Sequence, residues 1–399
     1  MSGRRNKVVV AMSGGVDSSV AACLLVEQGY EVVGLFMRVG VSEPVPAATG
    51  AATAARPHQG CCSASDAADA RFVAGLLGIP FYVLNFQADF EGLIRQFADE
   101  YAAGRTPNPC VHCNDKLKFG RLVQYADAVA ADYVATGHYA RLERSGVGIR
   151  MLRGRDARKD QSYVLFGVKP AVLPRVLFPV GELTKAEVRE VARRRGLPNC
   201  DKPDSVEICF VPDRDYARVV RERRPEAFTT GDVIDEAGRK VGEHKGLPHY
   251  TIGQRRGLRI AMGVPIYVTE LRTEDNTVRV GDSDALLRKA LIADRVNYLA
   301  EPPECPFRAQ VKVRYLHTAA DATVHPLGAD SVRVVFDEPQ RAIAPGQAAV
   351  FYDGDAVLGG GWIRCAESAP PNRPDESAPR SASVDGTCDQ VDFMAATTV

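Results

Sequence analysis

The beginning of the chain alternates short apolar runs with a helical apolar pattern. The run Lys-Val-Val-Val at 7–10 predicts a buried strand, and a second strand is expected from Glu31 to Met37. Between them, Ala21 and Leu25 recur at the spacing of one helix face. Strands that alternate with helices in this way are typical of an α/β fold with a doubly wound, mostly parallel sheet.

This alternation continues to about residue 196. Helices are expected near 65–77, 89–102 and 116–130, and strands at 81–84 and 133–136. Another helix should begin after Thr184, because Thr184 and Glu187 have the spacing of a capping box. We therefore expect residues 1–212 to form one α/β domain, within which the Ala-, Pro- and Gly-rich stretch 41–60 is predicted to be a mobile loop.

Beyond residue 212 the pattern changes to short strands separated by turns. Residues 213–289 show no long helical period and predict a small β-rich central domain. Residues 290–365 carry further short strands, one of them at 310–315, and predict a C-terminal β-barrel. The segment 366–399 is rich in Pro, Ser and Asp and is expected to be a disordered tail.

Composition narrows the class of protein only in part. The 399 residues include 50 Lys+Arg and 50 Asp+Glu, and this neutral total leaves nucleic-acid binding open because such binding depends on local patches. Apolar runs are too short to span a membrane and no secretory signal is evident, so we expect a cytoplasmic protein without membrane association. Ten cysteines in a chain of this length predict packed thiols, metal ligands or catalytic thiols.

The turn after the first strand carries candidate nucleotide-binding chemistry. Residues 11–19 read Ala-Met-Ser-Gly-Gly-Val-Asp-Ser-Ser, and the helix that follows presents its first N–H groups to this turn. Glycines let a pyrophosphate approach the backbone, although no Lys follows Gly15 as a Walker A loop would require. The alternative interpretation is an ordinary strand, turn and helix of the sheet that binds no nucleotide.

The candidate ATP-binding residues include two at the ends of other strands, where open α/β sheets bind ligands. The full set is Ala11, Met12, Ser13, Gly14, Gly15, Val16, Asp17, Ser18, Met37 and Gly137. Asp17 is also a candidate ligand for Mg²⁺ beside the phosphates, and a helix N-cap is its competing role.

Two thiols lie three residues apart in a cation-rich loop. Cys110 and Cys113 stand among Lys, His and Asn residues within 105–120. Nearby cations lower the pKa of a thiol and so increase the fraction of nucleophilic thiolate. A third cysteine, Cys209, ends the stretch Asp-Ser-Val-Glu-Ile-Cys at 204–209. Cys61 and Cys62 are adjacent, which is a poor spacing for a zinc site, and are expected to pack or to oxidise.

Several segments resemble motifs of known families. The Ser-Gly-Gly-Val-Asp-Ser loop resembles that of the PP-loop ATP pyrophosphatase superfamily, whose members split ATP into AMP and pyrophosphate. The combined set, in order from residue 7 to about 363, resembles the tRNA-specific 2-thiouridylase family. The segments that carry this resemblance are Thr-Pro-Asn-Pro-Cys-Val-His-Cys-Asn at 106–114, Ala-Thr-Gly-His-Tyr at 135–139, Lys-Asp-Gln-Ser-Tyr at 159–163, Ile-Cys-Phe at 208–210, Gly-Gln-Arg-Arg-Gly-Leu at 253–258 and Pro-Gly-Gln-Ala-Ala-Val-Phe-Tyr at 345–352.

The resemblance implies a fold and a reaction. It implies an adenine nucleotide alpha hydrolase-like PP-loop sheet, with ATP adenylating the C2 carbonyl of the tRNA wobble uridine, position 34. A cysteine persulfide would then supply sulfur, giving 2-thiouridine, AMP and pyrophosphate. The resemblance implies Cys113 as the nucleophile and Cys209 as the persulfide carrier, and a disulfide between the two during the cycle.

One departure from the family leaves a second mechanism open. Some members carry Asp where this chain has Cys110, so the base contact made by that carboxylate is in doubt here. Cys110, Cys113 and Cys209 could instead hold an iron–sulfur cluster, because three thiolates can bind a cubane. Two further alternatives are another PP-loop amidotransferase or ligase, and a non-catalytic RNA-binding protein.

Basic clusters and the same resemblance point to RNA. Arginines are concentrated at 141–158, 193–195 and 255–259, which favours a phosphate-binding surface. The residues that the resemblance implies as tRNA contacts are Asn108, Pro109, Lys159, Asp160, Gln161, Arg314 and Tyr315. The implied partners are a tRNA with a wobble uridine and a sulfur-donor protein, either a desulfurase or a sulfur relay.

Overall fold

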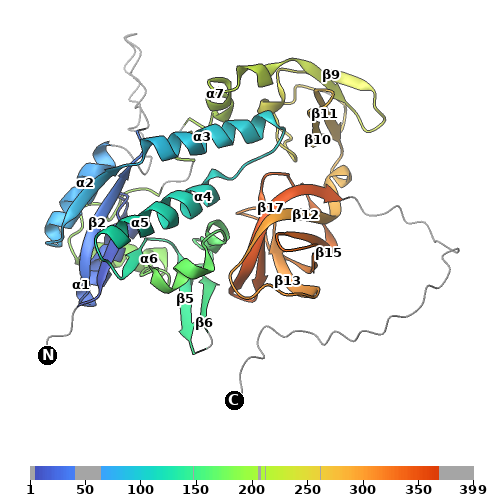
Figure 1. Ribbon diagram of the computed structural model, residues 1–399. Coiled ribbons are helices and arrows are strands. Elements are labelled where there is room, and N and C mark those ends of the chain that lie inside the picture. The colour runs from blue at the N-terminus through green and yellow to red at the C-terminus, as the bar shows by residue number, and fades with distance from the viewer. Residues whose placement is uncertain are drawn as a thin grey trace, which may run out of the picture. The chain divides into compact units, whose positions relative to one another are not determined.

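The computed structural model describes residues 5–40, 64–146, 148–204, 208–211, 213–260 and 262–367. The chain forms two compact units (Figure 1). The first comprises Met1–Ala98, Pro109–Arg144 and Ile149–Val219, and the second comprises Asp99–Asn108, Ser145–Gly148 and Val220–Val399. The predicted mobile loop at 41–60, the cysteines at 61 and 62 and the predicted tail beyond residue 367 lie outside the described residues.

A parallel sheet forms the centre of the first unit. Its strand order is β3-β2-β1-β4-β7, and every neighbouring pair is parallel. The bounds are β1 Lys7–Ala11, β2 Glu31–Arg38, β3 Phe81–Asn85, β4 Tyr133–Ala135 and β7 Val176–Leu177. The fully buried Val8 and Val10 of β1 pack with Val20 and Leu25 of the following helix, which confirms the predicted α/β arrangement.

Helices connect these strands (Figure 1). The α-helices are α1 Val16–Glu27, α2 Ala64–Leu76, α3 Gln87–Ala102, α4 Pro109–His112, α5 Leu122–Ala128, α6 Lys185–Arg194 and α7 Tyr216–Arg221. Shorter elements of this unit are the 3₁₀ turns η2 Ser162–Leu165 and η3 Pro170–Arg175. It also contains most of the hairpin strands β5 Ala140–Ser145 and β6 Gly148–Arg153, although residues 145–148 are counted with the second unit. The predicted capping box is confirmed, because Thr184 Oγ1 accepts from the Glu187 N–H and Glu187 Oε2 accepts from the Thr184 N–H.

The helix expected near 116–130 differs from the prediction in both type and start. A π-helix, η1, covers Cys113–Arg121, and an α-helix follows only from Leu122. Each π-turn places one extra residue between hydrogen-bonded groups, so the apolar positions lose the 3.6-residue spacing that sequence patterns detect. The π-helix therefore begins at one of the candidate catalytic thiols.

A small mixed sheet occupies part of the second unit. Its order is β10-β11-β8-β9, with bounds β8 Gly231–Ile234, β9 Lys240–His244, β10 Tyr267–Arg272 and β11 Thr277–Gly281. Strands β8 and β11 pair in parallel, whereas the other pairs are antiparallel. Buried Val233, Val268, Val278 and Val280 form its core. The 3₁₀ turns η4 Pro225–Phe228, η5 Leu247–His249 and η6 Asp284–Leu286 belong to the same unit.

An antiparallel barrel follows in the second unit (Figure 1). The order β12-β15-β14-β13-β16-β17 closes through pairing of β12 with β17, which confirms the predicted barrel. Its bounds are β12 Leu287–Tyr298, β13 Phe307–Lys312, β14 Ala320–Pro326, β15 Ser331–Arg341, β16 Ala348–Asp353 and β17 Ala356–Glu367. Closure leaves no unpaired sheet edge in the barrel. No helix among the described ranges is long and apolar enough to cross a membrane.

Candidate active site

The Ser-Gly-Gly turn folds back onto the first turn of α1. The Ser13 N–H donates to Ser18 Oγ at 3.1 Å, and the Ser18 hydroxyl donates to the Gly15 carbonyl at 3.1 Å. Gly15 is the N-cap and has no side chain that could cap the helix. The first N–H groups of α1 therefore face this turn, in the arrangement that binds anionic oxygens in other proteins.

Other candidate ATP-binding residues meet the same edge of the sheet. Gly137 follows β4, and a β-carbon at this position would lie 2.6 Å from the Ser18 nitrogen. Met37 is near the end of β2 and is half-buried, whereas Met12, just beyond β1, is buried. The carboxyl ends of β1, β2 and β4 thus lie together around the start of α1, where open parallel sheets bind ligands.

Asp17 makes an ion pair that the sequence did not predict. Lys185 Nζ donates to both carboxylate oxygens of Asp17, at 2.7 and 2.9 Å, and the Tyr139 hydroxyl donates to Oδ1 at 2.7 Å. The N-cap alternative for Asp17 is wrong, because Gly15 occupies that position. Burial, together with the adjacent negative charge of Asp17, raises the pKa of Tyr139 above its ordinary value. Tyr139 is thus a hydrogen-bond donor to Asp17.

The same ammonium group joins Asp17 to Asp204. Lys185 Nζ lies 2.7 Å from Asp204 Oδ1, and Lys159 Nζ lies 2.7 Å from Asp204 Oδ2. Arg189 is a third cation at 3.4 Å. Burial by itself would raise the pKa of Asp204, but the hydrogen bonds from Lys159 and Lys185 outweigh it and hold that pKa below its ordinary value. A charged network therefore runs from the glycine turn to the residue five positions before Cys209.

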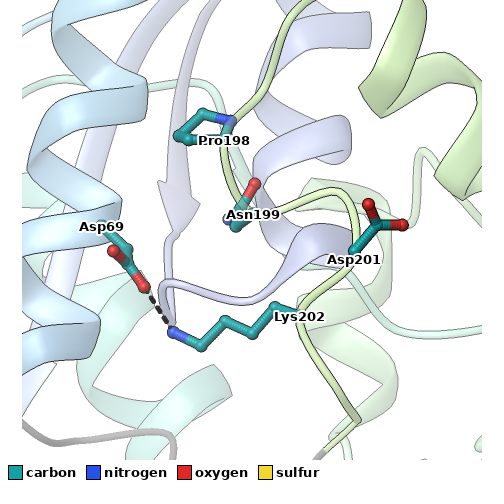
Figure 2. A pocket seen from close by; sticks show the side chains of 5 residues that line it. All are labelled: Asp69, Pro198, Asn199, Asp201 and Lys202. Atoms are coloured by element: carbon teal, nitrogen blue, oxygen red, sulfur yellow. Dashed lines mark hydrogen bonds and ion pairs between the residues drawn. The ribbon is translucent and has the colours of Figure 1, made fainter.

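A second lysine fixes the other side of the turn (Figure 2). Lys202 Nζ donates to the Gly14 carbonyl at 3.2 Å and to Asp66 Oδ1 and Asp69 Oδ2 of α2, each at 2.6 Å. Asn199 Nδ2 also donates to the Gly14 carbonyl, at 3.1 Å. Burial lowers the pKa of Lys202, but the two aspartates more than offset this and raise it. The lysine therefore stays charged and holds the turn against α2.

A cavity of about 320 Å³ opens beside this lysine. Figure 2 shows its lining residues, which are Asp69, Pro198, Asn199, Asp201 and Lys202. Four of the residues around the turn were not predicted as site residues from the sequence, namely Asn199, Lys202, Lys185 and Tyr139. Each of the four contacts the turn or the first turn of α1 from a distant part of the chain. The only nearby sequence pattern is the capping box at Thr184, which predicts the helix that begins at Lys185 but not its contact with Asp17.

The segment that carries Cys113 is fixed to α3. Gln96 of α3 contacts His112 Nε2 at 3.1 Å, and its side-chain oxygen accepts from Lys116 Nζ at 3.1 Å. His112 and Lys116 lie on either side of Cys113 in sequence, so a single glutamine holds the chain before and after this thiol. Cys113 itself is half-buried, whereas Cys110 is exposed.

The segment that carries Cys209 packs on the same helix. Phe210 is buried, and its ring makes edge contacts with Phe97 and Phe90 of α3 at centroid distances of 5.1 and 5.7 Å. Cys209 is half-buried beside this anchor. Helix α3 therefore supports both candidate catalytic segments, although Cys113 and Cys209 are far apart in sequence.

Comparison with known proteins agrees with this geometry. The tRNA methyl transferase HUP domain family matches residues 6–213, its PRC-barrel domain matches 218–282, and the aminomethyltransferase beta-barrel domain matches 288–363. A tRNA-specific 2-thiouridylase of Carboxydothermus hydrogenoformans is 50% identical over 364 residues, covering 90% of this chain and 98% of that protein. The chain belongs to the tRNA-specific 2-thiouridylase family.

Two further members of the 2-thiouridylase family show the same extent of similarity. The protein of Symbiobacterium thermophilum is 49% identical over 365 residues, covering 90% of this chain and 92% of its own length. The protein of Rhodopirellula baltica is 46% identical over 396 residues, covering 92% of this chain and 99% of its own. The similarity therefore includes the PP-loop domain, the central sheet and the closed barrel together.

The described cysteines of this 2-thiouridylase family member are not grouped as metal ligands. Within the part of the chain that the structure describes, no group of three or more His, Cys, Asp or Glu side chains is placed to hold a metal ion. Cys110, Cys113 and Cys209 all belong to that part. The arrangement of these three cysteines therefore does not fit the iron–sulfur alternative.

The candidate tRNA contacts of this 2-thiouridylase family member have different environments. Asp160 is buried, and its carboxylate accepts from the Gly154 and Ser162 N–H groups, each at 3.0 Å, and from the Ser162 hydroxyl. The Gln161 side chain accepts from the Tyr139 N–H at 3.0 Å. Lys159 makes the ion pair with Asp204 described above. These three residues order the segment beside the glycine turn.

The remaining candidate contacts lie elsewhere in the chain. Asn108 is half-buried and Pro109 is the buried first residue of α4. The strand expected at 310–315 ends at Lys312, so Arg314 and Tyr315 belong to the loop after β13. Both side chains are half-buried there, next to Leu316, which is 91% exposed. The early end of β13 thus presents an arginine and an aromatic ring on a barrel loop.

Proposed function

We propose that this protein is a tRNA-uridine 2-sulfurtransferase that converts the wobble uridine, position 34, of tRNA into 2-thiouridine. The observation that carries the proposal is the common support of two thiol segments by α3, in the unit that also contains the PP-loop turn. Relatives that are 46–50% identical over most of their length carry the name tRNA-specific 2-thiouridylase. The alternative, a PP-loop amidotransferase or ligase, would need no such pair of thiols.

ATP is the substrate that activates the uridine. The N–H groups at the start of α1 and the glycine turn suit its phosphates, while Met37 and Gly137 border the space expected for the nucleoside. Asp17 is the proposed ligand for the accompanying Mg²⁺, since a carboxylate beside phosphates suits a hard cation. The uridine C2 oxygen attacks the α-phosphorus of ATP, and pyrophosphate leaves.

Sulfur transfer then needs the two thiols in different roles. The terminal sulfur of a Cys209 persulfide attacks C2 of the adenylated uridine, and AMP leaves with the former C2 oxygen. The Cys113 thiolate attacks Cys209 Sγ, so the S–S bond breaks and its electron pair stays on the sulfur bound to C2. The product is a thiocarbonyl together with a Cys113–Cys209 disulfide. A cellular dithiol, or two thiols, must supply two electrons to reduce this disulfide, and a sulfur-donor protein must reload Cys209.

RNA binding is assigned to two groups of residues. We propose that Lys159, Gln161, Asn108 and Pro109 border the target nucleotide, with Arg314 and Tyr315 of the barrel as a separate contact. Asp160 serves this function indirectly, because its oxygens are used to order the chain at Gly154 and Ser162. An arginine and an aromatic ring suit an unstacked loop base.

The proposal is tested with purified protein, an unmodified tRNA carrying a wobble uridine, ATP with Mg²⁺ and a persulfide donor. We expect 2-thiouridine, detected by nucleoside mass spectrometry, together with AMP in equal amount. The control tRNA carries cytidine at position 34 and should yield neither product. Formation of AMP without thiolated nucleoside on the correct tRNA would contradict the sulfurtransferase assignment. If neither AMP nor thiolated nucleoside formed, the proposed adenylation step would be contradicted as well.

A further inference from the structure

We propose that Asn199 and Lys202 hold the peptide between Gly14 and Gly15 in the orientation that binds the phosphates of ATP. The inference rests on the proposed function, because it takes the glycine turn as the ATP site. Neither Asn199 nor Lys202 belongs to the candidate ATP-binding residues. Both act through the carbonyl group of Gly14, so their role is that of positioning residues.

The Gly14 carbonyl accepts two hydrogen bonds, from Asn199 Nδ2 at 3.1 Å and from Lys202 Nζ at 3.2 Å. Both side chains extend from one turn of the chain (Figure 2), in which the Lys202 N–H donates to the Asn199 carbonyl at 3.1 Å. Asn199 is 4% exposed and the Lys202 side chain 21%, so water has little access to either donor. A carbonyl oxygen has two lone pairs, and these two donors occupy both. The Gly14 carbonyl is therefore directed toward this turn.

The opposite side of the same peptide carries the Gly15 N–H group. A trans peptide is planar, and its C=O and N–H bonds point in opposite directions. Because the Gly14 carbonyl faces Asn199 and Lys202, the Gly15 N–H points away from them. Gly15 is the N-cap of α1, so this N–H lies beside the first N–H groups of the helix, which suit anionic oxygens.

The charges around Lys202 decide from which side an anion approaches the turn. Asp66 Oδ1 and Asp69 Oδ2 each lie 2.6 Å from Lys202 Nζ, on the side that the Gly14 carbonyl faces. Their negative charges repel phosphates there, because charges in a partly buried site are only weakly screened. The phosphates of ATP must therefore approach from the opposite side, toward which the Gly15 N–H points.

A peptide between two glycines needs such support. Its rotation changes only the ψ of Gly14 and the φ of Gly15, and neither residue has a β-carbon that would oppose the change. The rotated peptide would direct the Gly14 carbonyl oxygen at the phosphates and the Gly15 N–H at the Lys202 ammonium. Both contacts are repulsive. Affinity for phosphates therefore depends on the population of the orientation that Asn199 and Lys202 hold.

The same asparagine also supports the next peptide. Asn199 Nδ2 donates to Ser19 Oγ at 2.8 Å, and the Ser19 hydroxyl donates to the Gly15 carbonyl at 3.0 Å. Asn199 thus contributes to the orientation of two successive peptides of the turn. Its replacement is the sharpest test, because it removes these hydrogen bonds without changing the charge of the site.

The test measures the binding of inorganic pyrophosphate with Mg²⁺ by isothermal titration, since this anion probes the turn without the nucleoside. Asn199→Ala removes a neutral donor from the Gly14 carbonyl, and pyrophosphate should bind about ten-fold more weakly than to the unaltered protein. ATP should lose affinity by a similar factor. Adenosine, which carries no phosphate, should bind both proteins equally in ligand-observed NMR.

Two more variants separate the orientation of the peptide from the charge of the lysine. Lys202→Met removes the second donor together with a positive charge, so pyrophosphate should bind more weakly by more than about ten-fold. Asp201→Asn is the matched control, because Asp201 lines the same cavity but pairs with Arg193 at 3.2 Å and is 76% exposed. It should leave the pyrophosphate affinity unchanged. Urea unfolding establishes that each variant is folded before it is titrated.

Crystal structures observe the peptide directly. In the unaltered protein the Gly14 carbonyl should be directed at Lys202, and in Asn199→Ala it should be rotated in a fraction of the molecules. A carbonyl that is rotated away from Lys202 in the unaltered protein would contradict the inference.

The binding outcomes distinguish this inference from the proposed function. Equal affinity of Asn199→Ala and the unaltered protein for pyrophosphate would overturn the inference, and so would an equal loss of affinity for adenosine. A loss confined to Lys202→Met would also overturn it, because only the charge of the lysine would then matter. If the unaltered protein bound neither ATP nor pyrophosphate, the proposed function itself would be rejected.

Discussion

A β-carbon at Gly14 would lie 2.3 Å from the carbonyl oxygen of Asp66 in α2, closer than any real contact. Gly14 also has a φ of +73°, in the left-handed region. The sequence alone presents Gly14 only as a candidate ATP-binding residue of the glycine turn. The structure corrects this expectation, because the position is needed for packing as well.

We therefore predict that Gly14→Ala lowers the free energy of unfolding by about 1–3 kcal/mol, through backbone strain and the clash with α2. Gly15 provides the matched control, since a β-carbon there meets only Ser13 Oγ at 3.5 Å. Gly15→Ala should fold normally and still bind ATP less tightly. Urea unfolding and ATP titration check both variants. If Gly14→Ala and the unaltered protein had equal free energies of unfolding, the prediction would be wrong, because α2 would then move to accommodate the added methyl group.

The three thiols should respond differently to replacement. Cys113→Ala and Cys209→Ala should each abolish thiolation, because one attacks the disulfide sulfur and the other carries the transferred sulfur. Exposed Cys110 belongs to neither step, and Cys110→Ala should retain most of the activity. Nucleoside mass spectrometry measures the product, and anaerobic purification with iron and sulfide analysis provides the control. Stoichiometric iron with activity lost in all three variants would restore the cluster mechanism.

Phe210→Ala should damage sulfur transfer through the anchor on α3. Phe210 is 5% exposed and packs edge-on against Phe90 and Phe97, so we expect a loss of about 3 kcal/mol in unfolding free energy. Thiolation should fall further than ATP binding, because the glycine turn does not contact this ring. Phe72→Ala on α2, where the side chain is 58% exposed, is the control and should change neither quantity.

Stability should fall below neutral pH because of His138. Its side chain is buried between Phe119 and Phe178, with Thr136 Oγ1 at 2.7 Å, and burial followed by the charge of Lys118 lowers its pKa well below the ordinary value. In the unfolded chain the imidazole binds a proton below about pH 6.5, while the folded protein does not.

Unfolding free energy should therefore decrease as the pH falls from 7 to 5, with a slope approaching about 1.4 kcal/mol per pH unit from this group. His138→Gln cannot titrate and should flatten the slope by that amount. Urea unfolding of both proteins at a series of pH values measures this slope. A slope that is identical in the variant would mean that other groups cause the pH dependence.

The barrel loop should contribute to tRNA affinity by stacking and by charge. Tyr315→Ala should weaken binding by about 1–3 kcal/mol if its ring stacks on one base, with little change in salt dependence. Arg314→Ala should instead reduce the slope of log affinity against log salt by about one. Leu327→Ala is the matched exposed control at the end of β14 and should leave affinity unchanged. Fluorescence anisotropy across a salt series distinguishes these outcomes.

The sequence by itself determined the elements whose signals are local. The parallel sheet, the turn before α1, the capping box at Thr184 and the barrel strands follow from apolar periodicity and from residues that stand a few positions apart. Such patterns are readable because each is formed within one strand, one turn or one helix end. The choice of Cys113 and Cys209 as the reacting thiols came instead from the resemblance to the 2-thiouridylase family.

The tertiary structure decided which distant residues meet. The contact of Lys185 with Asp17 joins residues 168 positions apart, and that of Lys202 with Asp66 joins residues 136 apart. Neither pair has a periodicity or a spacing that a sequence could reveal, because ion pairs require only that two folded surfaces come together. The same is true of α3, whose Gln96 and Phe97 serve two different thiol segments. Packing also buries Asp160, a candidate RNA contact, and makes its carboxylate a hydrogen-bond acceptor for Ser162.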